Sequence, residues 1–438
     1  MVEITTDKSN KPPNIFGNLI SNTEKNPNSK ILLTLFVLLL FRFGNAIPLA
    51  GIDQEALKKS FLQLENKNAI LQIINMYAGG GGKTLLSPFS LGIIPFINAS
   101  ILVDLLIAIF PQLEKLQSEE GEAGRQKISF YKKLLTLFFA IIQSGFLIFY
   151  LKSYFYSTEI FDFVLVLLEL VNGTMFLVWL SGIIDKKGIG NGTSLIIFTN
   201  IIVTLLSKNI FEQAKFDNLL LIELLFLLFL TILICISQSA RINIEVVSAR
   251  QLAFLENTDK TGKEIRKSVD MLKLSKKLKE NGLSIKLNQA GIFPIIIASN
   301  LIPIFSYFLN SIIDSSNVSL VKGITNILYY LLLIGFNYFY TIIFWDPEKI
   351  SEQLRKASVS ILDITPGKAT VSYLENVVKS TSIIGGLFLC FILYIYDFVK
   401  EILNGYLLNQ INISSLIILV GVIYELQKAI RVLYKKNY

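Results

Sequence analysis

Histidine is absent from the 438 residues, and its absence excludes several classes of chemistry. Serine and cysteine hydrolases use an imidazole base, and histidine is the commonest zinc and haem ligand. Cysteine is almost absent as well. Cys235 and Cys390 each lie inside an apolar run and are predicted to be small buried hydrophobic residues, not a disulfide or a metal site. We therefore expect neither an enzyme nor a bound cofactor or metal.

Charged residues are also scarce, at 17% of the chain against 52% hydrophobic residues. Soluble proteins of this size usually carry more charge. The apolar residues form runs of roughly 17–25 residues, the length that spans about 30 Å of hydrocarbon as a helix. These runs lack the alternation of barrel strands, so the sequence predicts an all-α membrane protein.

About ten transmembrane helices are predicted, in two groups of five. The spans run near Ile31–Ala50, Phe89–Ile109, Lys133–Leu151, Phe161–Ile184, Ser194–Leu206, Leu219–Ile236, Ile292–Leu309, Ile324–Phe344, Leu374–Tyr396 and Ile413–Ala429. With the N-terminus inside, about 31 of the 41 Lys and Arg residues fall on the inner side and about 9 outside. By the positive-inside rule, both termini are inside. The net charge of +8 then reflects topology and does not indicate nucleic-acid recognition.

The predicted organisation follows these spans. A polar segment, 1–30, with no sign of a cleavable signal peptide, precedes a first half at 31–239. A long basic loop at 240–290 leads to a second half at 291–430 and a tail at 431–438. Halves with five spans each are inserted in opposite senses, the pattern of inverted repeats. The loop has a predicted amphipathic helix near Glu264–Glu280, and it is either a solvated connector or a docking site for a soluble partner.

Polar residues within the spans are functional candidates. Arg42 lies roughly 17 Å into the first span at about 1.5 Å per residue, and should face the bundle interior or snorkel. Asp104 and Gln143 lie on the second and third spans, where Gln143 is also explained by bonding between helices.

Proline and glycine interrupt the second and seventh spans at corresponding places. The residues are Gly92, Pro95, Gly291, Pro294 and Pro303. Broken helices at matching places in the two halves indicate a moving or pore-lining element.

The segment Tyr77–Thr84, YAGGGGKT, superficially suggests a nucleotide-binding loop. A Walker A motif needs glycine where this sequence has Tyr77, and no strand precedes it. The predicted topology also places the loop outside. A glycine hinge before the second span explains the segment better.

Seven blocks of sequence, in order, resemble the SecY family, the central channel subunit of the Sec translocon. They are FRFGNAIPLAGID (Phe41–Asp53), SLGIIPFINASI (Ser90–Ile101), EEGEAGRQKISFY (Glu119–Tyr131), NGTMFLVWL (Asn172–Leu180), KKGIGNGTSLIIF (Lys186–Phe198), NQAGIFPIIIAS (Asn288–Ser299) and ITPGKAT (Ile364–Thr370). The resemblance runs nearly end to end. It implies a clamshell of two half-bundles that passes unfolded polypeptides across the membrane and releases membrane segments sideways between spans two and seven.

The resemblance also implies roles for single residues. A pore ring, which seals the channel at the membrane midplane, falls on Ile93, Ile97, Thr193, Ile197, Ile296 and Ile418, where Thr193 departs from the aliphatic pattern. Stiff β-branched side chains exclude water without binding a passing peptide. The lateral gate and its hinges fall on Gly92, Pro95, Asn98, Gln143, Pro294 and Asn300. A plug helix is expected at about 64–77, with apolar residues Leu64, Ile70, Ile73, Ile74 and Met76. A surface amphipathic helix is the alternative for this segment.

The inner loops resemble the family's docking site for the ribosome or a SecA-type motor ATPase. The matching basic residues are Arg241, Arg250, Lys356 and Lys368, while Thr365 stands where bacterial relatives have arginine. The other expected partners are a SecE-type small membrane subunit, unfolded precursors and the lipid bilayer. The sequence looks most like an algal plastid-encoded member of the thylakoid membrane with both termini stromal, and a bacterial plasma membrane is the alternative. A secondary transporter for a small solute remains the alternative function, and it would need polar groups at the midplane.

Overall fold

The structure is a computed structural model that describes residues 27–57, 86–118, 120–157, 159–207, 218–248, 283–312, 318–362, 364–403 and 405–435. The predicted plug at 64–77, with Leu64, Ile70, Ile73, Ile74 and Met76, lies outside the described residues. So do the glycine segment Tyr77–Thr84, Arg250 and the predicted helix near Glu264–Glu280.

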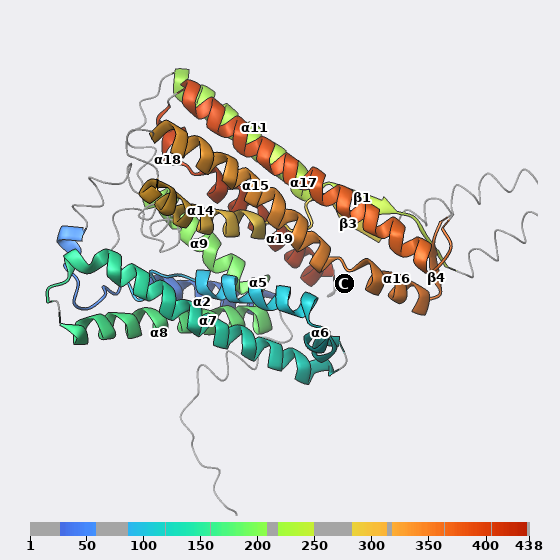
Figure 1. Cartoon of the computed structure of the whole chain (residues 1–438), viewed down its shortest axis with the longest axis horizontal. Helices are drawn as coiled ribbons and strands as arrows, with labels where there is room; N and C mark the ends of the chain where they lie inside the picture. Colours follow the sequence, from blue (N-terminus) through green and yellow to red (C-terminus); the bar gives the residue numbers. More distant parts are fainter. Residues whose placement is uncertain are drawn as a thin grey trace, which may run out of the picture. The chain divides into compact units, whose positions relative to one another are not determined.

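Within the described residues, each predicted span contains one long helix (Figure 1). In chain order these helices are α2 (Pro27–Gly44), α5 (Ile94–Ile109), α7 (Gly121–Leu151), α8 (Ile160–Lys187), α9 (Gly192–Ser207), α11 (Asn218–Ser239), α14 (Phe293–Ile312), α15 (Val318–Phe344), α17 (Lys368–Leu403) and α19 (Ile413–Lys435). Shorter helices between them are α6 (Pro111–Ser118), η2 (Lys152–Tyr154), α16 (Pro347–Lys356) and α18 (Tyr406–Gln410). The prediction of helical spans is confirmed.

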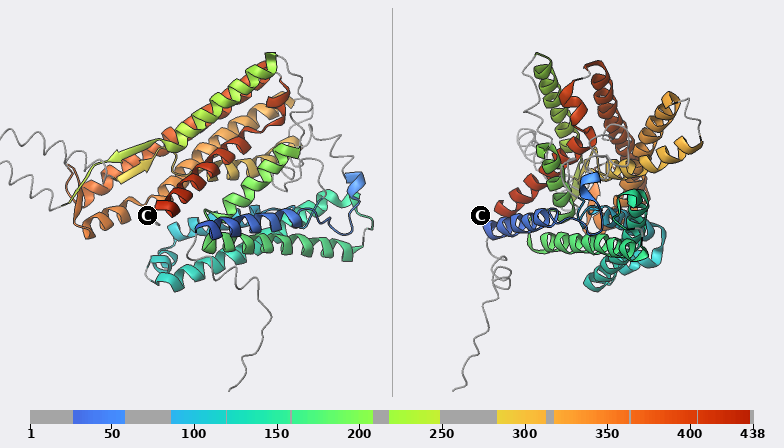
Figure 2. Two further views of the ribbon diagram at one scale, coloured as in Figure 1. Left: turned by 180° about the vertical axis from the view of Figure 1, so that it is seen from behind. Right: turned by 90° about the vertical axis from the view of Figure 1, so that its left-hand side faces the viewer.

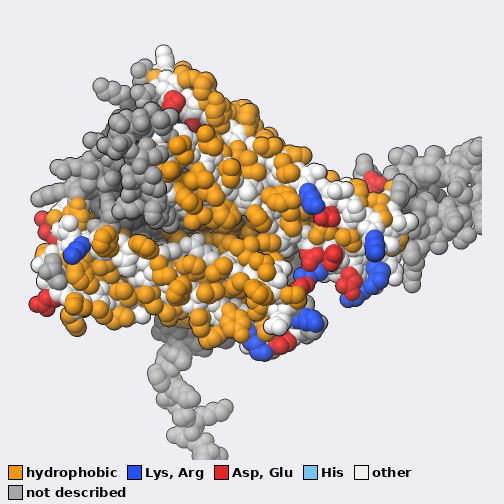
Figure 3. Space-filling model, in the orientation of Figure 1, with side chains coloured by type: hydrophobic (Ala, Val, Ile, Leu, Met, Phe, Trp, Pro, Cys, Tyr) orange, Lys and Arg blue, Asp and Glu red, His pale blue; other side chains and the backbone are white. Residues whose placement is uncertain are grey.

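The outward faces of the helices are apolar, as contact with lipid requires. Five segments of the described chain are long and apolar enough to cross a membrane: Gly121–Phe149, Ile160–Lys187, Asn218–Ser239, Gly323–Lys356 and Lys368–Leu403. The apolar helices Ile94–Ile109 and Gly192–Leu206 are shorter. Figure 3 shows apolar side chains along the helices and charged ones gathered near helix ends. Phe146 and Leu331, for example, expose 72% and 63% of their surface. Exposing such an apolar surface to water would cost free energy, whereas exposing it to the hydrocarbon of a membrane does not.

Helix ends differ from the predicted span ends in both directions. α2 ends at Gly44, although the first span was predicted to reach Ala50. α7 begins at Gly121, well before the predicted start at Lys133. The extension of α7 arises because hydrophobicity marks only the part of a helix that lies in lipid, whereas polar helix-forming residues continue the helix into water.

Arg42 is half-buried in the last turn of α2, where a cation complements the helix dipole, and its depth in the membrane stays a prediction. One prediction about a single residue is wrong. Cys235 was predicted to be buried, but it is exposed on α11, because the lipid-facing surface of a span is apolar too. Cys390 is half-buried, and both thiols are free.

The chain divides into two compact units. Unit 1 comprises Met1–Val103, Lys115–Asn209 and Val422–Tyr438, and unit 2 comprises Asp104–Glu114 and Ile210–Gly421. Three of the described helices contribute to both units, because the division falls within α5, α6 and α19. The predicted halves at 31–239 and 291–430 stay a prediction.

In unit 1, the segment that leads into α5 is held by α2 and α8. The Phe89 ring stacks on Phe41 of α2 at 6.0 Å and on Phe176 of α8 at 5.9 Å. A Cβ at Gly173 of α8 would lie 2.0 Å from the carbonyl oxygen of Pro88, and one at Gly44 would overlap the Phe89 ring. Glycine at both places therefore allows the close approach that fixes the start of α5.

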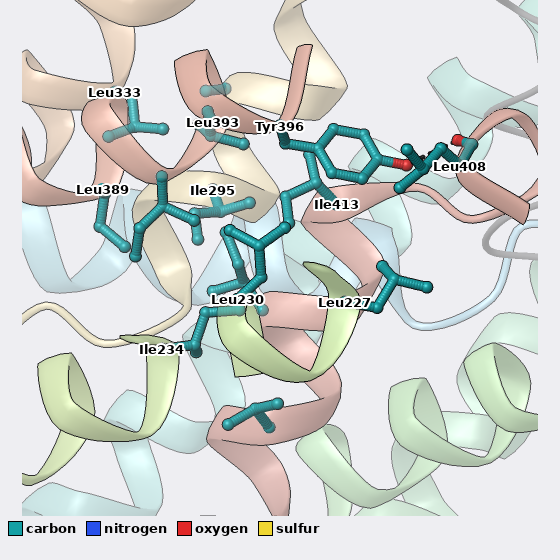
Figure 4. Close-up of a cluster of buried hydrophobic side chains, with 14 residues drawn as sticks. Leu227, Leu230, Ile234, Ile295, Leu333, Leu389, Leu393, Tyr396, Leu408 and Ile413 are labelled. Atoms are coloured by element: carbon teal, nitrogen blue, oxygen red, sulfur yellow. Dashed lines mark hydrogen bonds between the residues drawn. The ribbon is translucent and has the colours of Figure 1, made fainter. Parts of the chain in front are cut away.

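In unit 2, six helices share one hydrophobic core (Figure 4). Its buried residues are Leu227, Leu230, Ile234, Ile295, Ala298, Leu333, Leu389, Ile392, Leu393, Tyr396, Leu408, Ile413, Ile417 and Val420. They come from α11, α14, α15, α17, α18 and α19. The core therefore joins helices that are far apart in the sequence.

Two buried side chains clamp α18 at the end of this core. The Glu223 side chain, 1% exposed, accepts the N–H of Leu407 through Oε2 at 3.1 Å. The Tyr396 hydroxyl shares its one proton between the carbonyl oxygens of Leu408, at 2.7 Å, and of Ile411. Figure 4 shows the Tyr396 ring pointing at Leu408. The short helix is thereby fixed at both ends.

Replacing Gly405 should break this clamp. A Cβ at Gly405 would lie 1.3 Å from Glu223 Oε1, so Gly405→Ala must displace the carboxylate from Leu407. We expect a loss of about 1–3 kcal/mol in unfolding free energy, the usual effect of overpacking. Thermal or denaturant unfolding in detergent measures it. The matched control is Gly323→Ala on α15, where the added Cβ meets nothing within 4 Å. Equal stability of the two variants would contradict the clamp.

Candidate functional site

In unit 1, the predicted pore-ring residues lie at the first turns of two helices. Ile93 and Ile97 are each 2% exposed at the start of α5, and the Ile97 N–H donates to the Ile93 carbonyl at 3.2 Å. On α9, Ile197 is 5% exposed and follows Thr193 by four residues, so the two share a helix face.

The Thr193 hydroxyl has a partner outside the predicted ring. It shares a hydrogen bond of 3.1 Å with the Ser181 hydroxyl of α8. The start of α9 is further fixed by Asp185, whose Oδ1 accepts the Gly192 N–H at 2.7 Å, and by Asn191, which caps the helix. A hydroxyl engaged in this way is less available to bind water or ions.

In unit 2, Ile296 and Ile418 come from neighbouring helix surfaces. Ile296 lies in the first turn of α14 and is 3% exposed, and Ile418 on α19 is 1% exposed. A Cβ at Gly421, one turn after Ile418, would lie 2.8 Å from the Ile292 side chain. The face of α19 that carries Ile418 therefore packs against the start of α14.

The starts of α5 and α14 repeat one another in sequence and in backbone geometry. The pattern G-I-x-P-x-I-x-A-S occurs at 92–100 and again at 291–299. Gly92 has φ +59° and Gly291 has φ +62°, values that disfavour any side chain. The repeat makes Ile97 equivalent to Ile296. The corresponding glycines and prolines were recognised from the sequence, but the full repeat was not, although aligning the two spans on Gly92 and Gly291 shows it.

Buried side chains stabilise both turns that precede these helices. Asn288, 1% exposed, accepts the Gly291 N–H at 3.1 Å and donates to the Gly291 carbonyl at 3.2 Å. In unit 1, the Ser87 N–H donates to Ser90 Oγ at 2.8 Å. The buried Asn45 accepts a bond from the Ser87 hydroxyl at 3.4 Å and reaches Asn200 of α9 at 3.5 Å. These residues were not singled out from the sequence.

The predicted gate residues are placed as follows. Pro95 and Pro294 are buried in the first turns of α5 and α14. Asn98 on α5 and Gln143 on α7 are half-buried, and the Asn300 side chain lies outside the described residues. Proline in a first helical turn costs no backbone hydrogen bond, so these prolines set the helix direction without kinking it.

Two carboxylates within the spans were also missed. Glu169 on α8 accepts the N–H of Ala50 through Oε2 at 3.2 Å, and Glu223 on α11 accepts the N–H of Leu407 through Oε2. The available signal was a single acidic residue inside each apolar run. Within the described residues, no three His, Cys, Asp or Glu side chains gather as a metal site would require.

The predicted docking loops contain two strand pairs in unit 2 that were not predicted from the sequence, one within the first loop and one that joins the two loops. β1 (Arg241–Ile244) pairs antiparallel with β3 (Leu283–Lys286), and β2 (Val246–Ser248) pairs antiparallel with β4 (Val359–Ile361). Figures 1 and 2 show β1 and β3 beyond the end of α11, with α16 beside them and α18 at the opposite end of α17. We call β1–β4 and α16 the inner platform, after the side of the membrane that the loop charges predict for it.

The inner platform has a hydrophobic core of its own. The buried residues are Ile244, Ile285, Ile361, Leu374 and Val378, with Trp345, Ile350 and Leu354 packed against them. Arg241, Lys356 and Lys368 are exposed around it, and Arg250 lies outside the described residues. Of the four predicted docking residues, Arg241 and Lys356 therefore lie on the platform, and Lys368 lies beside it at the start of α17.

The turn that contains Thr365 is stabilised without an arginine. Gly367 has φ +112°, which requires glycine, and its carbonyl accepts the Ser351 hydroxyl at 3.4 Å. The Thr370 hydroxyl donates to the Thr365 carbonyl at 3.0 Å. Thr365 itself is exposed. A threonine at this position, in place of the arginine that the resemblance leads us to expect, therefore changes the surface charge and not the shape of the turn.

Comparison with known proteins agrees with this geometry. The SecY family model matches residues 87–427. A similar curated relative is the protein translocase subunit SecY of Pyropia yezoensis, 37% identical over 92% of this chain and 95% of that protein. Among solved structures, one on the plug domain of the SecY protein and the closed state of the translocation channel has a TM-score of 0.59 at 15% identity, over 92% of this chain and 91% of that one. Sec61 in the canine ribosome-channel complex has a TM-score of 0.53 at 17% identity, over the same shares of the two chains.

A test of the turn before α14 is Gly291→Ala. An added Cβ would meet nothing within 4 Å, so the effect comes from the positive φ alone. We expect a cost of about 1–2 kcal/mol in unfolding free energy. The control is Gly335→Ala, within α15, where space is also open and alanine favours the helix. The proposed backbone constraint is wrong if Gly291→Ala is as stable as the control.

Proposed function

The chain belongs to the SecY family, and from that premise we propose that it is the central pore-forming subunit of a protein translocation channel. It passes unfolded polypeptides across the membrane. The observation that carries this proposal is the burial of all five predicted ring isoleucines, none more than 5% exposed. A constriction of stiff aliphatic side chains blocks ions when empty and offers a passing chain no specific contact. The work of translocation then comes from a soluble motor or from translation.

We propose further that α5 and α14 form a lateral gate through which membrane segments leave. Support comes from the matching helix starts, where Gly92–Pro95 and Gly291–Pro294 impose the same backbone geometry. Helices that start abruptly from a fixed turn can pivot about that turn. Asn98 and Gln143 are the polar side chains proposed to line this gate. The plug at 64–77 belongs to the same proposal.

The inner platform is the proposed docking surface for a ribosome or a SecA-type motor. Exposed Arg241, Lys356 and Lys368 suit an anionic partner surface, because charged rims raise the rate of association. A SecE-type small membrane subunit and unfolded precursors complete the proposed partners.

The protein is a multi-pass membrane protein, and we place it in the plastid thylakoid membrane with both termini stromal. Its curated relatives come mostly from algal plastid genomes and cyanobacteria. The excess of Lys and Arg on the inner side supports this orientation. Detection of the protein in a plasma-membrane fraction alone would contradict the assignment.

Crosslinking tests the channel against a solute transporter. In a variant without Cys235 and Cys390, single cysteines replace Ile93 or Ile296, and a precursor with one cysteine is stalled in transit. Both positions are expected to crosslink to the precursor, because the chain must pass the constriction. Leu331→Cys, on the lipid-facing side of α15, is the control and should remain unlinked. Absence of a crosslink at both ring positions would favour the transporter.

Charge reversal tests the docking surface. Lys356→Glu together with Lys368→Glu should weaken binding of the ribosome or motor to vesicles that contain the protein, by about threefold to tenfold at low salt. The matched control is Lys152→Glu, an exposed lysine on the predicted outer side. Binding assays across a salt series measure the effect. Unchanged binding of the double variant, or an equal loss in the control, would exclude this surface.

A further inference from the structure

A lysine bridges two carboxylates where the inner platform meets the chain that follows α5. Lys349 Nζ lies 2.8 Å from Glu114 Oε1 and 3.1 Å from Asp346 Oδ2. Glu114 belongs to α6, and the other two residues belong to the start of α16. All three lie in unit 2. The bridge therefore joins segments more than 230 residues apart in the sequence.

On the platform side, the bridge is held rigidly. Asp346 caps α16, since its Oδ1 accepts the N–H groups of Glu348 at 3.1 Å and Lys349 at 3.3 Å. Pro347 occupies the first helical position, which its fixed φ suits. Ile350 and Leu354, on the same helix, pack into the platform core. The position of Lys349 is thus set by the platform.

On the other side, Glu114 is coupled to the inner end of α5. The Phe110 N–H donates to the Leu106 carbonyl at 2.9 Å, and the Glu114 N–H donates to the Phe110 carbonyl at 3.2 Å. These bonds continue from α5 through Phe110 into α6 without a flexible break. A displacement of the end of α5 therefore moves Glu114.

We propose that the Glu114–Lys349 bridge is a latch that ties α5, the gate helix, to the inner platform and favours the closed gate. A partner that docks on α16 and draws Lys349 away from Glu114 releases the end of α5. Lys349 is a positioning residue in this scheme and does not contact the translocating chain. The inference rests on the proposed function.

The bridge is strong enough to shift the equilibrium between the closed and the open gate, but too weak to prevent opening. The side chains of Lys349 and Glu114 are 47% and 38% exposed, so solvent screens their attraction. Exposed ion pairs of this kind change an equilibrium constant by about 1.5-fold to 5-fold. A docking partner can supply such a difference with one or two new contacts.

The test is a double-mutant cycle on the resting ion conductance of the purified channel in lipid vesicles. Lys349→Gln and Glu114→Gln should each raise the conductance by about two- to fivefold. The double variant should raise it no further, because either single change already removes the bridge. Conductance is measured with no ribosome or motor present, so altered docking cannot produce the effect.

A matched control is the pair Lys127–Glu120, 2.7 Å apart and similarly exposed, which joins residues of one helix start. Its neutral variants, Lys127→Gln and Glu120→Gln, should leave the conductance at the wild-type value. Wild-type conductance in the Lys349 and Glu114 variants, or a double effect equal to the product of the single effects, would overturn the latch. Failure of the wild-type vesicles to translocate any precursor would instead overturn the proposed function.

Discussion

Every peptide group within a membrane must find its hydrogen-bond partner in the protein, because hydrocarbon offers none. An unpaired buried group costs several kcal/mol, roughly half the stability of a typical domain. Helices meet this requirement by themselves. Where this chain leaves the helical path, side chains accept the backbone N–H groups. The buried Glu223, Ser90 and Asn288 accept those of Leu407, Ser87 and Gly291, and the partly buried Glu169 accepts that of Ala50.

This use of polar side chains separates a polypeptide channel from a solute transporter. A transporter needs several polar groups that converge on its substrate. In the described spans and the turns beside them, Glu169, Glu223 and Asn288 form hydrogen bonds with backbone groups. The Thr193 hydroxyl forms one with the Ser181 hydroxyl. The other five positions of the proposed pore ring are isoleucine. An aliphatic lining of that kind excludes water and ions but makes no sequence-specific contact with a polypeptide. It therefore suits a channel that passes chains of varied sequence.

The inner platform is built differently from the membrane part, because water competes for every polar contact there. The β1–β3 pair closes one loop, the β2–β4 pair joins that loop to a second one distant in the sequence, and a small apolar core around Ile285 and Leu374 stabilises them. Contacts at its edge, such as the ion pair of Lys349, are weak individually. Weak contacts are appropriate at a regulated junction, because a partner can exchange them for its own at little cost.

Sequence alone determined the helical spans and the family, and its loop charges predict the orientation in the membrane. Each of these depends on long runs of residues, over which hydrophobicity and charge sum to a large free energy. The α2 end at Gly44, the exposed Cys235 and the strand pairs of the platform were decided by tertiary structure. So were the roles of Glu223 and Asn288, since a single polar residue in an apolar run does not reveal which backbone group it serves. These hydrogen bonds form between segments that folding brings together. The local sequence does not indicate which segments will meet.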